Sequence, residues 1–129
     1  MSNTCSFDDS TFFLLQQLSK ANNALLELGS TYLQLGDLGK AVKPLKKLVR
    51  DYASTSDLVN AGYLKLGLIA YNQDNTDEAL NYYKNVCTNN PTGEEMASAL
   101  RSIEEIYIDR GEPNKYIAFL KTIDYVTTI

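Results

Sequence analysis

The sequence predicts an all-α fold made of repeated helix pairs, on two observations. The stretch LELGSTYLQLGDLGKA (residues 26–41) has a counterpart in YLKLGLIAYNQDNTDEA (residues 63–79) at a constant offset of 38 residues, which pairs Gly29 with Gly67, and a weaker third copy follows after a further 37 residues. Apolar residues recur three and four positions apart, and no long stretch alternates apolar and polar residues as a strand would. A fixed period in this range is typical of repeat proteins, in which each unit buries its apolar face against its neighbours. Corresponding positions include Leu28, Leu66 and Ile103, then Leu45, Tyr83 and Leu120, then Leu48, Val86 and Ile123.

A helix is predicted ahead of the first copy, over residues 10–20. Apolar residues continue from it into the first copy at spacings of 4, 3, 4, 3 and 4, at Leu14, Leu18, Ala21, Leu25, Leu28 and Tyr32. This stripe crosses Asn22 and Asn23 unbroken, so residues 10–35 form either one long helix or two. The predicted organisation is an N-terminal segment and helix (1–21) and a repeat domain (22–129), with units at about 22–57, 60–93 and 97–129.

Apolar spacing predicts a second helix in the first unit, and a proline lies inside this predicted helix. The segment LGDLGK breaks the first helix, and Ala41, Leu45 and Leu48 resume the apolar spacing. Pro44 falls inside this second helix, where it removes a hydrogen bond to the Lys40 carbonyl at a cost of roughly 3 kcal/mol. We therefore expect either a kink at Pro44 or a helix that begins late.

Helix starts in the later units carry recognisable polar residues. Asn75 is followed three residues later by Glu78, and Thr92 by Glu95, which is the spacing of a capping box. Pro113 stands where the first turn of the last helix is expected, a position that tolerates proline.

The repeated residues resemble the tetratricopeptide repeat (TPR) signature, W-x2-L-G-x2-Y, later A-x3-F, then P. The matching positions are Leu25, Leu28, Gly29, Tyr32, Ala41 and Leu45 in the first unit, Tyr63, Leu66, Gly67, Ala70, Ala79, Tyr83 and Pro91 in the second, and Leu100, Ile103, Glu104, Tyr107, Tyr116 and Leu120 in the third. The resemblance covers roughly residues 22–126 and implies a right-handed superhelical array of antiparallel helix pairs, with about three repeats plus the N-terminal helix. In this family, the small residues at Gly29, Ala41, Gly67 and Ala79 mark where two helices cross closely, which explains a helical glycine despite a loss of about 1 kcal/mol in propensity.

The chain departs from the family pattern in its longer period, its lack of tryptophan and Tyr116 in place of alanine. The expected location is the cytoplasm, if Met1 is the native start. This style is also similar to bacterial TPR arrays of envelope assembly factors, which gives the alternative, a fragment of an exported chain in the periplasm.

Composition excludes several kinds of function. The 129 residues are 44% apolar and 22% charged with a net charge of −4, so the chain lacks the basic field of a nucleic-acid binder, and no apolar run is long enough to cross a membrane. It has no histidine, the commonest general base and metal ligand. We predict no catalytic residues, no metal site and no cofactor.

Three further groups of residues receive structural interpretations. Neighbouring carboxylates on a helix point about 100° apart and do not converge on one pocket, so the acidic pairs are interpreted as helix-start or surface residues. They are Asp8–Asp9, Asp77–Glu78, Glu94–Glu95 and Glu104–Glu105. Cys5 and Cys87 lack metal-type spacing, and Cys87 is expected to be buried. Tyr32, Tyr83 and Tyr107 are expected in the core with the hydroxyl at its rim.

Lys40, Lys43, Lys47 and Arg50 form one basic stripe on a helix. The stripe is interpreted as a solvated outer face. The alternative is an acidic partner, such as the acidic third unit of another copy.

The resemblance places a concave groove on the first helix of each unit. Its positions here are Asn23, Leu26, Ser30, Leu33 and Gln34, then Leu64, Leu68, Tyr71 and Asn72, then Arg101, Glu105, Ile108 and Asp109. Some TPR domains clamp a peptide carboxylate with Lys, Asn and Arg, but the corresponding residues here are Leu26, Ser30, Leu68, Ser98 and Ser102, which excludes such a clamp.

The predicted function is therefore a non-catalytic adaptor that binds an apolar or amphipathic protein segment in this groove. The nearest candidate occupant is the chain's own residues 12–18. The alternative is a structural piece of a longer array, whose surfaces serve neighbouring repeats or self-association as a homo-oligomer. Nucleic acid is not an expected partner.

Overall fold

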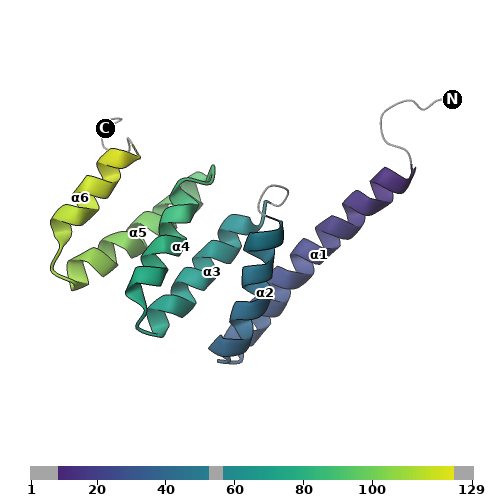
Figure 1. The fold of residues 1–129 in the computed structure, drawn as a ribbon, viewed down its shortest axis with the longest axis horizontal. Coiled ribbons are helices and arrows are strands. Elements are labelled where there is room, and N and C mark those ends of the chain that lie inside the picture. The colour runs from purple at the N-terminus through teal and green to yellow at the C-terminus, as the bar shows by residue number, and fades with distance from the viewer. Residues whose placement is uncertain (1–8, 53–56, 124–129) are drawn as a thin grey trace. The chain divides into compact units, whose positions relative to one another are not determined.

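The computed structural model describes residues 9–52 and 57–123, which form six α-helices (Figure 1). They are α1 (Asp9–Gln34), α2 (Leu38–Asp51), α3 (Val59–Asn72), α4 (Thr76–Cys87), α5 (Gly93–Asp109) and α6 (Pro113–Thr122). None of the residues in these two ranges lies in a β-strand, so the all-α prediction is confirmed. The chain divides between Val59 and Asn60 into two compact units, and each is described by itself.

The first unit is the antiparallel pair of α1 and α2. α1 is one continuous helix through Asn22 and Asn23, which answers the question that its sequence left open. It has 26 residues against 14 in α2, and α2 packs along its C-terminal half, so the N-terminal half of α1 extends beyond α2 (Figure 1). The two helices are joined at Gly36, whose φ of 80° lies in the left-handed region that favours glycine.

Gly29 sets the closest approach of α1 to α2. A Cβ at this position would lie 2.5 Å from Leu45 Cγ, so no other residue fits without movement of the core. Leu45, Leu48 and Ala41 are fully buried on the facing side of α2. The predicted reason for a glycine in the middle of this helix is confirmed.

Pro44 does not delay the start of α2, so that expectation is wrong. The helix begins at Leu38, and the Asp37 side chain caps it by accepting a hydrogen bond of 3.1 Å from the Lys40 amide. Pro44 is buried, and removing its ring from water offsets part of the cost of the lost backbone bond. The kink stays a prediction.

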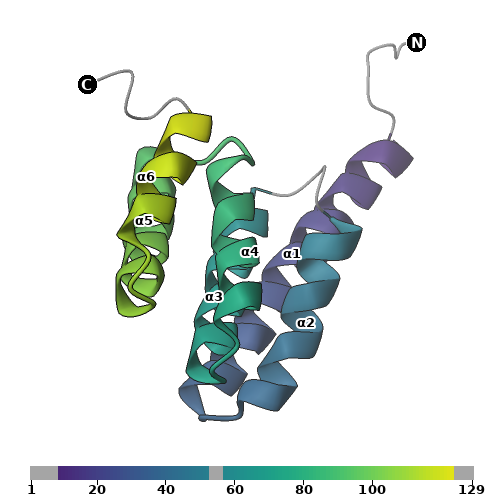
Figure 2. The ribbon, with the colours of Figure 1, turned by 60° about the vertical axis from the view of Figure 1, so that its left-hand side comes forward.

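The second unit contains α3 to α6, arranged as two successive antiparallel pairs (Figure 2). Gly67 repeats the role of Gly29, because a Cβ there would lie 2.6 Å from Tyr83 Cε1 on α4. One apolar core joins the four helices. It contains Ala70, Ala79, Leu80, Tyr83, Val86, Cys87, Ala99, Leu100, Ile103, Ile106, Tyr107 and Leu120.

Polar residues fix the helix ends of this unit as predicted. Thr92 and Glu95 form a complete capping box at the start of α5. Asn75 Oδ1 caps α4 by accepting a hydrogen bond from the Glu78 backbone amide at 3.3 Å. The Glu78 side chain accepts from the Asn75 side-chain amide, whereas in a capping box it accepts from the backbone amide of the cap residue. Pro113 occupies the first turn of α6.

Candidate protein-binding surface

Eight predicted groove residues lie in the second unit, on α3 and α5, and we call this surface the α3–α5 face. They are Leu64, Leu68, Tyr71, Asn72, Arg101, Glu105, Ile108 and Asp109. On α3, Leu68 is 47% exposed and Asn72 is exposed, whereas Leu64 and Tyr71 are half-buried against the core. On α5, Ile108 is 55% exposed, and Arg101 and Glu105 are exposed. The face therefore presents two uncovered aliphatic side chains among polar ones.

A contact between the two helices brings their C-terminal ends together. The Tyr71 hydroxyl donates a hydrogen bond to Asp109 Oδ2 at 3.4 Å. The pKa of Tyr71 is raised from its usual value, mainly by the negative charge of Asp109 and then by that of Glu105. The two carboxylates disfavour the loss of the Tyr71 hydroxyl proton, because ionisation would add a negative charge beside them. This end of the face therefore has a negative potential.

A shallow depression lies beside this contact. Its volume is about 350 Å³. It is lined by Tyr71, Asn72, Asp74, Thr76, Ile106, Asp109 and Arg110. The depression is large enough to receive a side chain of a partner.

The remaining predicted groove residues lie on α1, in the first unit. Leu26, Ser30 and Leu33 are half-buried, and Gln34 and Asn23 are exposed. Since they belong to the other compact unit, their place in a single groove stays a prediction.

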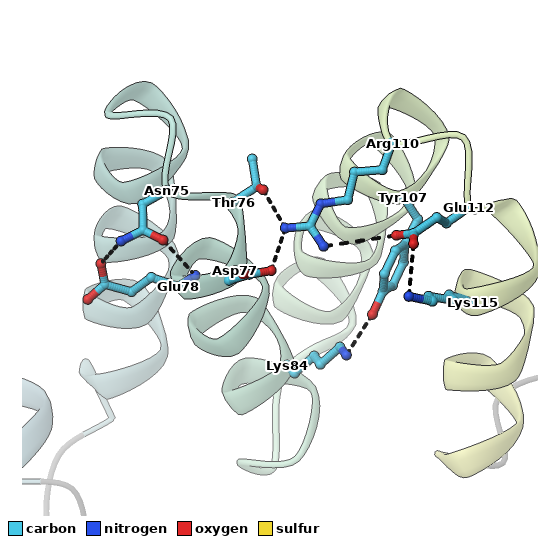
Figure 3. Close-up of polar contacts among 9 residues, drawn as sticks. All are labelled: Asn75, Thr76, Asp77, Glu78, Lys84, Tyr107, Arg110, Glu112 and Lys115. Carbon is cyan, nitrogen blue, oxygen red and sulfur yellow. Dashed lines mark hydrogen bonds and ion pairs between the residues drawn. The ribbon is translucent and has the colours of Figure 1, made fainter.

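The sequence did not predict a second, more polar pocket, of about 590 Å³, where α4, α5 and the start of α6 meet. Figure 3 shows Arg110 directed toward the start of α4, where its guanidinium binds Thr76 and donates to Asp77 Oδ1 at 2.6 Å. Glu112 accepts from Lys115 at 2.8 Å. These cations are thus neutralised by carboxylates within the same unit.

Lys84 occupies the base of this polar pocket and makes a different kind of contact. Its ammonium donates to the Tyr107 hydroxyl at 2.8 Å, and it lies 5.3 Å from the Tyr107 ring centroid and 5.1 Å from that of Phe119. Attraction between a cation and an aromatic ring stabilises such an arrangement. The placement of Tyr107, 6% exposed with its hydroxyl at the rim of the core, agrees with the prediction.

Two of the acidic pairs lie at helix starts, as interpreted from the sequence. Asp77 and Glu78 lie in the first turn of α4, and Glu94 and Glu95 in that of α5, where they interact favourably with the helix dipole. Within residues 9–52 and 57–123, no group of three or more Cys, Asp or Glu side chains is arranged to hold a metal ion. Asp8 and Cys5 lie outside the described residues.

The buried Cys87 is unsuited to nucleophilic chemistry. It is 6% exposed, and burial raises the pKa of its thiol to about 11. Because the thiolate is the reactive form, this cysteine acts as a small apolar core residue at neutral pH.

The basic stripe on α2 is exposed along its length, as predicted for a solvated face. Lys47 and Arg50 both bind Asp51, at 3.0 and 2.8 Å, and their hydrogen bonds lower the pKa of Asp51 to about 2. Lys40 lies 3.8 Å from Asp37. Exposed ion pairs of this kind add little to the free energy of unfolding, which agrees with a solvated outer face.

Comparison with known proteins gives one match. A protein-family model described as tetratricopeptide repeat matches residues 26–94. A search of curated proteins finds no match, and neither does a search of solved structures. Among the described helices, none combines the length and apolar character needed to span a membrane.

Proposed function

Because the chain belongs to the tetratricopeptide repeat family, whose members are protein-interaction modules, we propose that it is a non-catalytic adaptor that binds an apolar or amphipathic segment on the α3–α5 face. The observation that carries this proposal is the exposure of Leu68 and Ile108, at 47% and 55%, on two first helices whose ends are in contact. Aliphatic side chains spaced one helical turn apart on a partner would fit between them, as in other helix-in-groove complexes.

The charges around Tyr71 suggest the chemistry of the partner. Asp109, Glu105 and Asp74 all act on its hydroxyl. A bound segment with Lys or Arg beside its apolar residues would therefore meet opposite charge at this end of the face. Complementary charge of this kind fixes the orientation of a bound segment more than it raises affinity.

The proposal can be tested with peptides selected from a displayed library of amphipathic helices, with Leu or Phe at positions i, i+3 and i+7 and random residues elsewhere. For the selected peptides, Leu68→Glu should raise the dissociation constant measured by calorimetry about 10- to 100-fold, because it removes a leucine that becomes buried in the complex. The matched control is Leu35→Glu, the same substitution at a leucine that is 73% exposed and lies in the other unit.

Two results would contradict the proposal. One is a set of selected peptides that bind the Leu68→Glu variant as tightly as the parent chain. The other is a selection that returns only peptides whose binding is lost equally in the Leu35→Glu control.

A further inference from the structure

The first repeat leaves one face of its first helix uncovered, and the corresponding face of the third repeat is buried. Leu28 and Ile103 occupy the same position of the repeat. Ile103 is fully buried in the core of the second unit, where α3 and α4 supply Ala70, Ala79 and Tyr83. Leu28 is 46% exposed. The two positions differ because the α3–α4 pair covers this face of α5 in the second unit, whereas α2 does not cover the same face of α1 in the first.

Leu28 lies on a side of α1 that does not face α2, about 100° around the helix from Gly29. Two further leucines of α1 are exposed, Leu14 at 62% and Leu18 at 38%. Leu18 lies on nearly the same side as Gly29, in the half of α1 that extends beyond α2, and the half-buried Leu25 separates it from Leu28. We call the three exposed leucines the α1 stripe.

Among the described residues, the α5–α6 pair exposes the reciprocal positions. In the second repeat, Leu80 is 6% exposed within the core that α5 completes, and Tyr71 packs against the same core. The corresponding residues of the third repeat, 37 positions later, are Ile117 and Ile108. They are 47% and 55% exposed. The α5–α6 pair thus exposes apolar side chains at the positions that, in the second repeat, pack in the core shared with the following repeat.

We propose that the chain associates with a second copy of itself head to tail, with the α5–α6 end of one copy packed on the uncovered stripe of α1 in the next. The contact would continue the packing that already joins α4 to α5 inside one chain. A second copy is the partner that this chain itself defines, because it carries both halves of the interface in the same repeat register. Such an interface uses two different surfaces, unlike the self-complementary patch of a two-fold dimer.

This inference does not rest on the proposed peptide site. Ile108 lies on both surfaces, so the test uses Ile117, which lies outside the α3–α5 face. Leu28→Glu disables the α1 stripe and Ile117→Glu disables the α5–α6 end. Both side chains are about half-exposed, so neither substitution opens the core. Far-UV circular dichroism and thermal melting of each variant establish that it is folded.

Sedimentation velocity over micromolar to submillimolar concentrations tests the proposal. The parent chain should associate into species that grow with concentration, and each variant alone should remain monomeric. An equimolar mixture of the two variants should form dimers and nothing larger, because one intact α1 stripe and one intact α5–α6 end remain. Leu35→Glu should associate like the parent, since Leu35 has the exposed Gln73 as its counterpart in the second repeat.

Three outcomes would overturn the proposal. A parent chain that stays monomeric at all concentrations would show that a second copy does not cover the stripe. Association of Ile117→Glu alone into a dimer would show that α1 pairs with α1. A folded pair of variants that fails to form the mixed dimer would show that the two surfaces do not bind each other.

Discussion

Glycines at the helix crossings are the residues whose identity the fold restricts most. A leucine at Gly67 would place its Cβ 2.6 Å from the Tyr83 ring, which is buried and cannot move into solvent. Gly67→Leu should therefore lower the free energy of unfolding by roughly 1–3 kcal/mol through overpacking, measured by urea denaturation. The matched control is Gly39→Leu, where the nearest atom to an added Cβ is Asp37 Oδ1 at 3.9 Å. Equal stability of Gly67→Leu and the parent would contradict the assigned crossing of α3 and α4.

Asn60 is a buried polar residue that joins the start of α3 to the turn between α4 and α5. Its amide donates to the Asn89 carbonyl and to Glu95 Oε1, both at 3.1 Å, and its oxygen accepts from Asn89 at 2.9 Å. Asn60→Ala leaves these groups without their partner, so it should destabilise the chain by about 1–3 kcal/mol in the same measurement. Asn85→Ala, on a half-buried asparagine of α4, provides the comparison. A loss no larger than that of Asn85→Ala would show that water replaces Asn60 without penalty.

Cys87 should make stability fall in alkaline solution. Its thiol keeps its proton up to a pKa of about 11 in the folded chain, whereas the thiol of the unfolded chain loses its proton near its usual pKa of 9.0. Between these values the folded state binds more protons than the unfolded state, so the thiol's contribution is fully present below pH 9.0 and is lost as the pH rises toward 11.

Alkylation reports the same property directly. In a Cys5→Ser background, iodoacetamide should modify Cys87 slowly at pH 8 and rapidly once urea unfolds the chain. Equal rates in the two states would place the thiol at the surface.

At the scale of the helix, the termini show how far local sequence determines an element. The Thr92–Glu95 capping box could be predicted because both partners lie within four residues of each other. Thr92→Ala should destabilise the second unit by about 1 kcal/mol. Thr31→Ala, at an exposed position in the last turn of α1, should not destabilise the chain, because alanine is the better helix former. If both substitutions have the same effect on the melting midpoint, the cap does not stabilise α5.

Other helical features could not be predicted, because they depend on contacts distant in sequence. Pro44 is buried inside α2, and no rule of local propensity describes that burial. The polar pocket at the α4, α5 and α6 junction collects Lys84, Arg110 and Lys115 from three elements without a shared motif. The continuity of α1 through two asparagines was likewise left open by its pattern.

For the whole molecule, the repeat period determined the fold class, since one period gave the helix pairs, their crossings and the family. The candidate site was predictable only in part. Helical spacing gave Leu68 and Ile108 a common face, but the sequence did not show which groove leucines would stay exposed. Leu64 packs into the core and Leu68 does not, a difference that arises from how α3 rests on its neighbours.

Amide chemical shifts would show where a partner binds on this chain. With a selected peptide added to isotopically labelled protein, the largest changes should occur at Leu68, Tyr71, Glu105 and Ile108, and the amides of Lys84 and Lys115 should move little. Changes centred instead on the polar pocket around Lys84 and Lys115, with Leu68 and Glu105 unmoved, would contradict binding at the α3–α5 face.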